Sequence, residues 1–504
     1  MVSSFSSDRS VCVRFAPSPT GFLHIGGVRV ALFNWLFARQ KQGQFFLRIE
    51  DTDLQRSEER FTQDIIDSMK WLGLNWDQEP LFQSQRIEIY REKAEELVSK
   101  GLAYRCYCTE AQVEKMREQA IQEGKKPQYD RRCRNLQLSA RQDQPFVIRA
   151  KIPLEGVTQF HDLIRGPIQF ENEGLDDFVL IRSNGVPTYH LSVVVDDVFS
   201  KMTHILRGDD HINNTPKQVH LYQFFSYPVP QFAHLPMILG PDKKKLSKRH
   251  GAVSANFYRA QGFLPEALLN FLARLGWSHG DQEIFDLDEM VRFFSFEHVQ
   301  KSSAVFNEEK LLWLNGAHIR KSTPQRLLSI VQEDYSDYFS KDAWLRANTP
   351  LGCQIVILIQ SKVKLIKELA EQLVPLCTPG VIEVDSTGLK WNKDANLKTL
   401  IQPAIEHLIE ILSQKMESVS SFHRSDQDLP WGHSPSLVQA GWMPPDIEGC
   451  LQQICSEHGV KLGDLTQPIR LMITGRLVSA GLFELLSLLP WDLVKARLIK
   501  VITL

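Results

Sequence analysis

The opening of the sequence constrains the fold most, because it holds a strand, a glycine loop, a helix and a second strand in close succession. Residues 11–16 are the apolar run V-C-V-R-F-A, and the turn formers P-S-P-T-G follow at 17–21. After H-I-G-G, apolar residues recur at helical spacing over 28–39, and residues 45–53, F-F-L-R-I-E-D-T-D, resemble a strand that ends in acids. Such a unit favours a parallel sheet that binds ligands beyond the carboxyl ends of its strands.

A second α/β half follows after an interruption. Helical patterns cover 59–72 and 84–101, and residues 106–135 form a distinct stretch with C-Y-C, a charged helical segment and the basic K-K-P-Q-Y-D-R-R-C-R. Strand signals then return at 146–152, 177–182, 188–197 and 204–210. The sequence therefore predicts a nucleotide-binding fold that is split by an insertion.

The carboxyl half differs in character. From about residue 255 the pattern is a long succession of helices, and the polar stretch 418–436 is the best linker candidate. With 504 residues, the chain exceeds the length at which single cores stop growing, about 250–300 residues. The predicted fold class is multidomain, with a split Rossmann-like parallel-sheet domain, an α/β insertion and an all-α carboxyl-terminal half.

Composition excludes several classes. Hydrophobic residues make up 43% of the chain and charged residues 23%, which is typical of globular proteins and not of disordered or fibrous ones. The net charge of -2 means that any nucleic-acid binding rests on local basic surface. The amino terminus lacks the apolar segment of a signal peptide, and no apolar run reaches the roughly 18 residues that cross a bilayer. We therefore expect a cytoplasmic protein with no membrane partner.

Two distant motifs carry chemistry. Gly26 and Gly27 open a helix directly after a strand and loop, so a flat ring can approach the backbone, and His24 projects towards the same place. Residues 242–251, D-K-K-K-L-S-K-R-H-G, place Lys245 and Lys248 where they can neutralise charge on a triphosphate. A capped helix or a solvated lysine cluster explains either motif alone, but their combination favours a nucleotide site.

These motifs carry a family resemblance. H-I-G-G and K-L-S-K-R resemble the two signature motifs of class I aminoacyl-tRNA synthetases. The segments V-R-F-A-P-S-P-T-G-F-L-H-I-G-G, L-R-I-E-D-T-D, V-P-T-Y-H-L, R-G-D-D-H-I-N-N-T-P and L-S-K-R-H-G-A are similar to those of bacterial glutamyl-tRNA synthetases. The likeness extends over essentially the whole chain.

The resemblance implies a glutamate pocket. Arg14 would bind the γ-carboxylate, because an arginine fork suits a carboxylate geometrically, and an arginine within an apolar strand needs a buried anion. Arg207 would lie near the α-carboxylate and Glu50 on the ammonium group. The remaining pocket residues implied by the resemblance are Ala16, Ser18, Tyr189 and His211.

The resemblance also implies the ATP site. His24, Gly26 and Gly27 would lie beside adenine and ribose, and the loop residues implied for ATP are Lys245, Leu246, Ser247, Lys248 and Arg249. His24, Lys245 and Lys248 are the expected catalytic residues. With Mg²⁺, glutamate would attack ATP to form glutamyl-adenylate, and the glutamyl group would then pass to the terminal adenosine of tRNA. The family's need for tRNA before activation is expected here too.

The resemblance also bears on a zinc site. Cys106, Cys108 and Cys133, with Tyr129, resemble the zinc-binding insertion of some bacterial members, and three thiolates at this spacing suit zinc. Asn135 stands where a histidine or cysteine is expected, and asparagine is a poor zinc ligand. Tyr129 is a conceivable substitute, and three buried free thiols are the alternative.

The carboxyl-terminal half resembles an anticodon-binding region. Within residues 467–486, Arg470 and Phe483 offer a cationic plane and an aromatic face to single-stranded bases, although Phe483 could equally be a core residue. Gln360 lies where many glutamate-specific members carry an arginine that rejects the glutamine anticodon. We therefore expect this chain to acylate glutamine tRNA as well as glutamate tRNA.

The resemblance assigns roles to predicted domains. They are the first catalytic half at 1–90, a connective insertion for the tRNA acceptor end at 91–188, the second catalytic half at 189–243, a signature-loop and stem-contact domain at 244–325, and helical anticodon-binding domains at 326–504. We expect a monomer that does not bind DNA.

Three alternatives remain. A glutaminyl-tRNA synthetase would bind a neutral amide and usually carries β-barrels in its carboxyl half. A truncated relative that glutamylates a modified tRNA base lacks an anticodon-binding half. An inactive tRNA-binding relative would be expected to lose His24, a loop lysine or Arg14, and all of these are present.

Overall fold

The computed structural model describes residues 10–53, 55–124, 126–135, 144–246, 254–384, 386–387, 389–390, 394–417 and 434–503. The chain forms two compact units, one of residues 1–258 and 268–308 and one of residues 259–267 and 309–504. Most of the predicted linker, residues 418–433, lies outside the described part of the chain.

The predicted strand, helix and strand at the start of the chain are confirmed. Strand β1 (Cys12–Phe15) pairs in parallel with β2 (Gln44–Ile49), with α1 (Ile25–Gln40) between them in sequence. Strand β3 (Leu81–Phe82) extends the sheet in parallel beyond β2. Helices α2 (Glu59–Trp71) and α3 (Ile87–Ser99) complete this half, close to the predicted bounds.

The second α/β half joins the first along β1. Strands β9 (His204–Gly208) and β10 (Gln231–Leu235) are parallel, with α6 (Thr215–Phe224) between them in sequence. The amide of Thr203, just before β9, donates to the carbonyl of Cys12 at 3.0 Å, so β1 and β9 lie side by side. Their carboxyl ends, where Arg14 and Arg207 lie, therefore face a common site.

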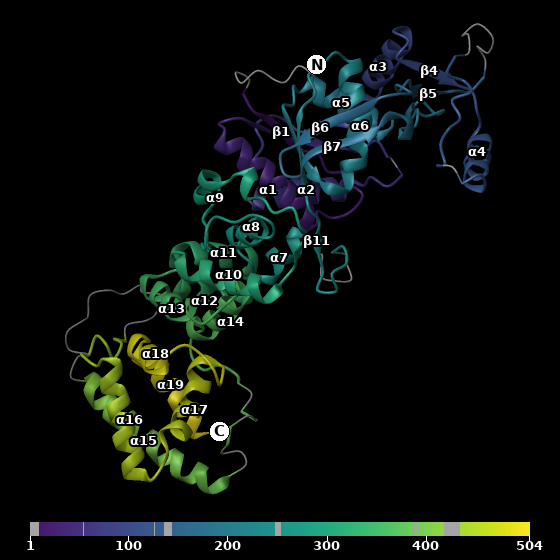
Figure 1. Ribbon diagram of the computed structural model, residues 1–504. Coiled ribbons are helices and arrows are strands. Elements are labelled where there is room, and N and C mark those ends of the chain that lie inside the picture. The colour runs from purple at the N-terminus through teal and green to yellow at the C-terminus, as the bar shows by residue number, and fades with distance from the viewer. Residues whose placement is uncertain are drawn as a thin grey trace. The chain divides into compact units, whose positions relative to one another are not determined.

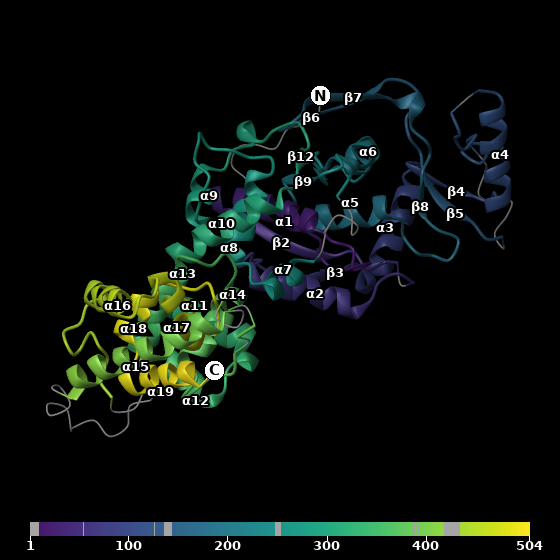
Figure 2. The ribbon, with the colours of Figure 1, turned by 90° about the horizontal axis from the view of Figure 1, so that it is seen from below.

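The insertion contributes two pieces of sheet. Strands β4 (Ala103–Cys106), β5 (Val147–Ala150) and β8 (Val179–Ile181) form an antiparallel sheet near α4 (Glu110–Gln122), away from α1 (Figures 1 and 2). The hairpin β6 (Val157–Asp162) and β7 (Gly166–Glu171) instead extends the β9–β10 sheet, in the order β7-β6-β10-β9. The end of β6 is thereby joined to the second α/β half.

One predicted strand is wrong. Residues 188–197 have a β-branched run that favours a strand locally, but they belong to helix α5 (Tyr189–Phe199). Every residue from Leu191 to Asp197 is buried, so the segment shows no polar face from which a helical period could be recognised. Its two buried aspartates pair with arginines that are distant in sequence, Asp196 with Arg86 and Asp197 with Arg14 and Arg48.

Short elements complete the first unit. They are the 3₁₀ turns η1 (Gln83–Arg86), η3 (Asn172–Gly174), η4 (Asp209–Asn214) and η6 (Phe296–His298), the parallel pair β11 (Ile238–Leu239) and β12 (Ala304–Val305), and α9 (Leu287–Phe293). Helices α7 (Ala255–Gln261) and α8 (Pro265–Arg274) run across the sequence division between the units.

The second unit is helical, as predicted. Its helices are α10 (Glu308–Lys321), α11 (Pro324–Tyr335), α12 (Lys341–Ala347), α13 (Pro350–Gln360), α14 (Ile366–Cys377), α15 (Ala395–Glu417), α16 (Pro444–His458), α17 (Leu462–Thr474), α18 (Leu482–Leu488) and α19 (Trp491–Ile502), with the 3₁₀ turn η7 (Ser336–Tyr338). Fully buried Arg497 donates to the carbonyls of Gly380, Ile473, Pro375 and Thr378, so α19 is bonded to the ends of α14 and α17. Within the described residues, no helix combines the length and apolarity needed to cross a membrane.

Candidate active site

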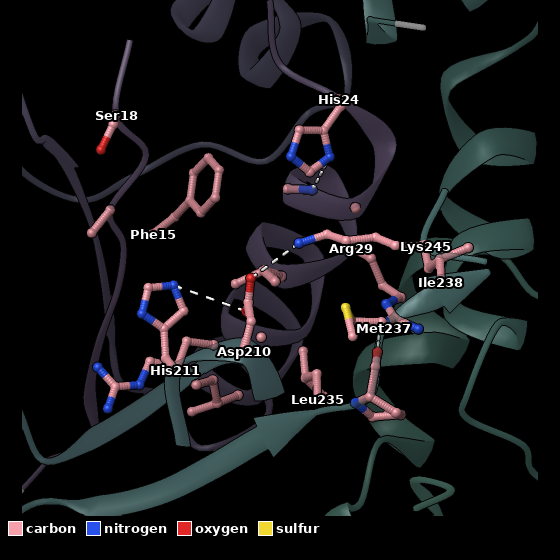
Figure 3. A pocket seen from close by; sticks show the side chains of 18 of the residues that line it. Phe15, Ser18, His24, Arg29, Asp210, His211, Leu235, Met237, Ile238 and Lys245 are labelled. Carbon is pink, nitrogen blue, oxygen red and sulfur yellow. Dashed lines mark hydrogen bonds and ion pairs between the residues drawn. The ribbon is translucent and has the colours of Figure 1, made fainter. Parts of the chain in front are cut away.

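A cavity of about 470 Å³ opens at the carboxyl ends of β1 and β9, within the first unit (Figure 3). It brings together the predicted residues of both ligand sites, namely Arg14, Ala16, Ser18, His24, Gly26, Gly27, Glu50, Tyr189, Arg207, His211, Lys245 and Leu246. The predicted residues Ser247, Lys248 and Arg249 lie outside the described part of the chain.

Asp197 anchors one end of the cavity. Its buried carboxylate accepts hydrogen bonds from Arg14 Nε at 3.1 Å and Arg48 Nη1 at 2.6 Å, and from the hydroxyl of Tyr222 at 2.8 Å. Burial alone would raise the pKa of Asp197, but the two guanidinium groups lower it to about 2. The aspartate is therefore a permanent counter-ion that ties β1, β2 and α6 to α5.

The bond to Asp197 also orients Arg14 for a ligand. Asp197 occupies Nε and, at 3.5 Å, Nη2 of Arg14, while Nη1 has no acceptor among the described residues. The Arg14 side chain is 5% exposed and lines the cavity. An anion that enters the cavity can therefore bind a guanidinium whose orientation is already set.

Arg207 enters the cavity from β9. Its Nε donates to His234 Nε2 at 3.2 Å, its Nη2 donates to Thr215 Oγ1 at 2.8 Å, and its Nη1 lies 3.5 Å from the Tyr189 hydroxyl. That hydroxyl lies 3.0 Å from His211 Nδ1. Burial and the charge of Arg207 lower the pKa of His211 to about 4, so this histidine is neutral near pH 7.

Glu50 adds a carboxylate to the same cavity. Arg48 Nη2 donates to Glu50 Oε1 at 3.1 Å, and Glu50 lines the cavity. Burial raises the pKa of Glu50, while Arg48 and Arg14 offset part of this effect. The cavity thus offers two buried guanidinium groups and one carboxylate at the same end, a set that matches the charges of an acidic amino acid.

His24 caps the helix at the other end of the cavity. Its Nδ1 accepts from the Gly27 amide at 3.2 Å, and burial together with nearby Lys245 lowers its pKa. His24 is therefore neutral, with its proton on Nε2. A Cβ on Gly26 would lie 3.0 Å from the His24 ring, so any other residue there would press on the ring and require it to shift.

Sequence reasoning missed several lining groups. Lys245 Nζ donates to Asp210 Oδ2 at 3.3 Å, and Asp210 is the acidic residue that ends the strand signal at 204–210. Arg29 donates to the carbonyls of Leu275, at 2.6 Å, and Pro236, which positions the apolar wall Pro236–Ile238. Asp197 carried a signal as well, since an aspartate that ends an apolar run is costly to bury without a partner.

The predicted zinc ligands converge. The sulfur atoms of Cys106, Cys108 and Cys133 lie within 4.8 Å of one another. The Tyr129 hydroxyl is 3.2 Å from Cys106 Sγ and 3.8 Å from Cys108 Sγ, and Cys108 Sγ is 3.7 Å from Cys133 Sγ. Tyr129 is buried, whereas Asn135 is exposed.

The residues predicted to read the anticodon lie in the second unit, on different helices. Gln360 ends α13 and is half-buried, and its buried Oε1 has no hydrogen-bond partner among the described residues. Arg470, on α17, donates from Nη1 to Ser479 Oγ and the Ala480 carbonyl, each at 2.9 Å. Phe483, on α18, is half-buried against the helical core. Arg470 and Phe483 therefore also make contacts within the protein, Arg470 by hydrogen bonds and Phe483 by packing.

Comparison with known families gives two matches. Residues 10–313 match the family described as tRNA synthetases class I (E and Q), catalytic domain, and residues 435–502 match an anticodon binding domain. The first match covers more than half of the chain.

Full-length relatives agree with these matches. The chain is 43% identical to a glutamate–tRNA ligase of Thermodesulfovibrio yellowstonii, covering 98% of this chain and 99% of that one. It is 44% identical to that of Geobacter sulfurreducens, covering 97% of both chains. The crystal structure of a glutamate tRNA ligase from Elizabethkingia meningosepticum, in complex with its amino acid, is similar with a TM-score of 0.77 at 28% identity, over 98% of this chain and 99% of that one.

The Asp197 cluster predicts a large stability effect. Asp197→Asn leaves the guanidinium groups of Arg14 and Arg48 without their shared counter-charge, so the free energy of unfolding of the first unit at pH 7 should fall by about 3–5 kcal/mol. Because the folded pKa of Asp197 is lowered to about 2, its contribution is present above about pH 4 and is lost as the pH falls through about 2. Urea unfolding at several pH values measures both effects.

The half-exposed pair of Glu95 and Arg105 provides the control, since Glu95→Gln should cost about 1 kcal/mol or less. Equal losses in the two variants would contradict the role given to Asp197.

Proposed function

The chain belongs to the class I tRNA synthetases for glutamate and glutamine, and from this premise we propose that it is a glutamate–tRNA ligase. It activates L-glutamate with ATP to glutamyl-adenylate and then transfers the glutamyl group to the 3′ terminal adenosine of glutamate tRNA. The observation that carries this proposal is the pair of buried arginines, Arg14 and Arg207, that enter one cavity from adjacent strands.

Charge pairing supports glutamate as the amino acid. Arg14 and Arg207 can bind the two carboxylates, and Glu50 can accept from the ammonium group. A glutaminyl enzyme has to bind a neutral amide, and a guanidinium with a free N–H edge gains less from an amide than from a carboxylate. The glutamine alternative is therefore disfavoured by Arg14.

The ATP end uses the other half of the cavity. Adenine would lie against the wall of Pro236, Met237 and Ile238, near the start of α1, and Lys245 would bind the phosphates. Mg²⁺ usually takes one or two carboxylates together with substrate phosphates, and Asp210, beside Lys245, is placed to be such a ligand. When bound, the cation would neutralise phosphate charge.

The reaction requires no protein nucleophile. An oxygen of the glutamate α-carboxylate attacks the α-phosphorus of ATP, the bond to the bridging oxygen breaks, and pyrophosphate leaves. A ribose hydroxyl of the terminal adenosine then attacks the carbonyl carbon, and AMP leaves. Arg207 holds the attacking carboxylate, while His24 Nε2–H and Lys245 stabilise charge on the phosphates, so the acceleration comes from positioning and electrostatics.

Pyrophosphate exchange with glutamate or glutamine, with and without tRNA, tests this function. We predict exchange with glutamate only, and only when tRNA is present. Arg14→Ala should lower kcat/KM for glutamate by about 100-fold or more, because a buried charge-assisted contact is lost, with little change in the KM for ATP. Arg39→Ala, in the last turn of α1 and outside the cavity, is the control. Exchange that prefers glutamine, or an unaffected Arg14→Ala variant, would contradict the proposal.

A structural zinc ion in the insertion is proposed on the geometry of four side chains. Zn–S bonds of about 2.3 Å place the sulfur atoms of a tetrahedral site about 3.8 Å apart. The 3.7 Å between Cys108 Sγ and Cys133 Sγ fits this spacing, and we assign the fourth ligand to the Tyr129 hydroxyl, 3.2 Å from Cys106 Sγ. The residues therefore fit zinc, which would close the insertion around β4 and α4.

Metal analysis of the purified chain tests the zinc site. We predict about one zinc per chain, lost in Cys133→Ser but retained in Cys353→Ser, whose thiol lies outside the cluster. Thiol titration is a second measurement, because bound thiolates should react only after a chelator is added. Three freely reactive thiols in metal-free protein would support the alternative of a cluster of free cysteines.

Anticodon recognition by the second unit is proposed around Gln360, Arg470 and Phe483. Ile359, next to Gln360, lines the same small crevice as Ser479 and Ala480, the partners of Arg470, so these segments are close together. A neutral side chain at 360 lacks the charge and bulk with which an arginine rejects the glutamine anticodon. We propose that the enzyme also acylates glutamine tRNA with glutamate.

Charging assays with the two tRNAs test this relaxed specificity. The unaltered enzyme should charge both glutamate and glutamine tRNA with glutamate, and Gln360→Arg should reduce charging of glutamine tRNA by about tenfold or more relative to glutamate tRNA. Lys362→Arg, at an exposed position just beyond α13, is the matched control. If the unaltered enzyme leaves glutamine tRNA from the same cell uncharged, the proposal is wrong.

A further inference from the structure

A buried chain of hydrogen bonds reaches Arg207 from outside the signature motifs. Asp162, at the end of β6, bonds to His234 on β10, and His234 bonds to Arg207 on β9. Asp162 and His234 are both fully buried, and neither lines the cavity. A buried hydrogen-bond network stabilises the fold only if its polar groups are all hydrogen-bonded. The donor and the acceptor of each bond can therefore be assigned in turn.

Asp162 accepts four hydrogen bonds. Its Oδ1 accepts from the amides of Ile164 and Arg165, at 3.0 and 2.9 Å. Its Oδ2 accepts from the amide of His234 at 3.0 Å and lies 2.6 Å from His234 Nδ1. Burial alone would raise the pKa of Asp162, but the hydrogen bonds from His234 and the amides lower it. The carboxylate is ionised and cannot donate, so the Nδ1 of His234 must carry a proton.

This proton determines what His234 presents to Arg207. Burial lowers the pKa of His234, although Asp162 opposes the shift, so the ring is neutral near pH 7 and its Nε2 is unprotonated. Nε2 can therefore accept the Nε–H of Arg207, 3.2 Å away. With the other tautomer, two N–H groups would face each other, and the guanidinium would have to turn away.

The other hydrogen bonds of Arg207 agree with this assignment of donors and acceptors. Thr215 Oγ1 accepts from Arg207 Nη2 at 2.8 Å, and its hydroxyl can donate to His234 Nε2 at 3.1 Å or to the carbonyl of His211 at 3.3 Å. Nε, Nη1 and Nη2 of Arg207 each make one contact, with His234, Tyr189 and Thr215 respectively. One N–H on each terminal nitrogen then has no acceptor among the described residues, and these two groups can bind a carboxylate.

We propose that His234 and Asp162 are positioning residues for substrate binding: Asp162 holds His234 in the Nδ1–H tautomer, and His234 holds the guanidinium of Arg207 at the angle that receives the α-carboxylate of glutamate. The inference rests on the proposed role of Arg207. It also gives the β6–β7 hairpin a function in the amino-acid site, because Asp162 belongs to that hairpin and pairs in register with Phe232 of β10. The salt bridge between Arg165 and Asp209, at 2.7 Å, is a second link from the same turn to the rim of the cavity.

Two variants of His234 separate the two ends of its ring. In His234→Asn the amide can reach the Nδ1 position and donate to Asp162, but it leaves no acceptor for Arg207. In His234→Gln the side-chain oxygen can reach the Nε2 position and accept from Arg207. In steady-state aminoacylation, the KM for glutamate should rise by about tenfold or more in His234→Asn and by less than about threefold in His234→Gln. The KM for ATP should change by less than about threefold in both.

His220→Asn is the matched control for loss of a buried histidine. His220 lies on α6 and is 5% exposed. Its Nε2 is within hydrogen-bond distance, 2.8 Å, of the hydroxyl of Thr158 on β6, the strand that also carries Asp162, but His220 does not line the cavity. It should lower thermal stability without a selective rise in the KM for glutamate. Wild-type kinetics in His234→Asn, or losses that are equal for glutamate and ATP and equal in the two His234 variants, would overturn the proposal.

Arg207→Ala distinguishes failure of this inference from failure of the proposed function. An unchanged KM for glutamate in Arg207→Ala would remove the substrate role of Arg207, and with it the reason to position the residue. A raised KM in Arg207→Ala together with wild-type values in His234→Asn would leave the substrate role intact and overturn the positioning alone. A raised KM in both supports the proposal.

Discussion

The pairing of the buried Asp197 carboxylate with Arg14 and Arg48 is the interaction on which this end of the cavity depends. Two guanidinium groups, from Arg14 and Arg48, meet at a fully buried position, and two unpaired cations there would cost several kcal/mol each. Asp197 neutralises part of this charge and is itself held by Tyr222. Because these residues come from β1, β2, α5 and α6, the same contact that allows Arg14 to be buried also joins the two halves of the split sheet.

The first half of the fold was predictable because its signals are local. The strand, glycine loop and helix before Arg39 follow from residue spacing, and five residues predicted from the two motifs line one cavity, namely His24, Gly26, Gly27, Lys245 and Leu246. Helix α5 was not predictable in this way. Its V-V-V-D-D segment is buried on all sides, so its conformation depends on arginines that are distant in sequence, with Arg86 bonded to Asp196 and Arg14 to Asp197. Ion pairs between residues that are distant in sequence cannot be derived from the periodicity of apolar residues.

The same limit applies to the insertion. Sequence spacing suggested three thiols and a tyrosine as a group, and the structure brings Cys106, Cys108, Tyr129 and Cys133 together. The sequence did not suggest that the β6–β7 hairpin pairs with β10. A single polar residue at the end of a strand, such as Asp162, has no distinctive spacing. Only the three-dimensional pairing of Asp162 with His234 connects the hairpin to Arg207.

The two ends of the cavity differ in how firmly their charges are held. At the Arg14 end, Arg14 and Asp197 are 5% and 0% exposed, so low local dielectric strengthens their contact and an entering carboxylate meets donors of set orientation. At the His24 end, Lys245 and Asp210 are 65% and 48% exposed, and such pairs contribute about 0–1 kcal/mol. Under the proposed assignment of the two ends, a triphosphate would replace Asp210 as the partner of Lys245 at little cost. Selectivity for the amino acid would then reside in buried charges, while the nucleotide end would be free to rearrange as pyrophosphate leaves.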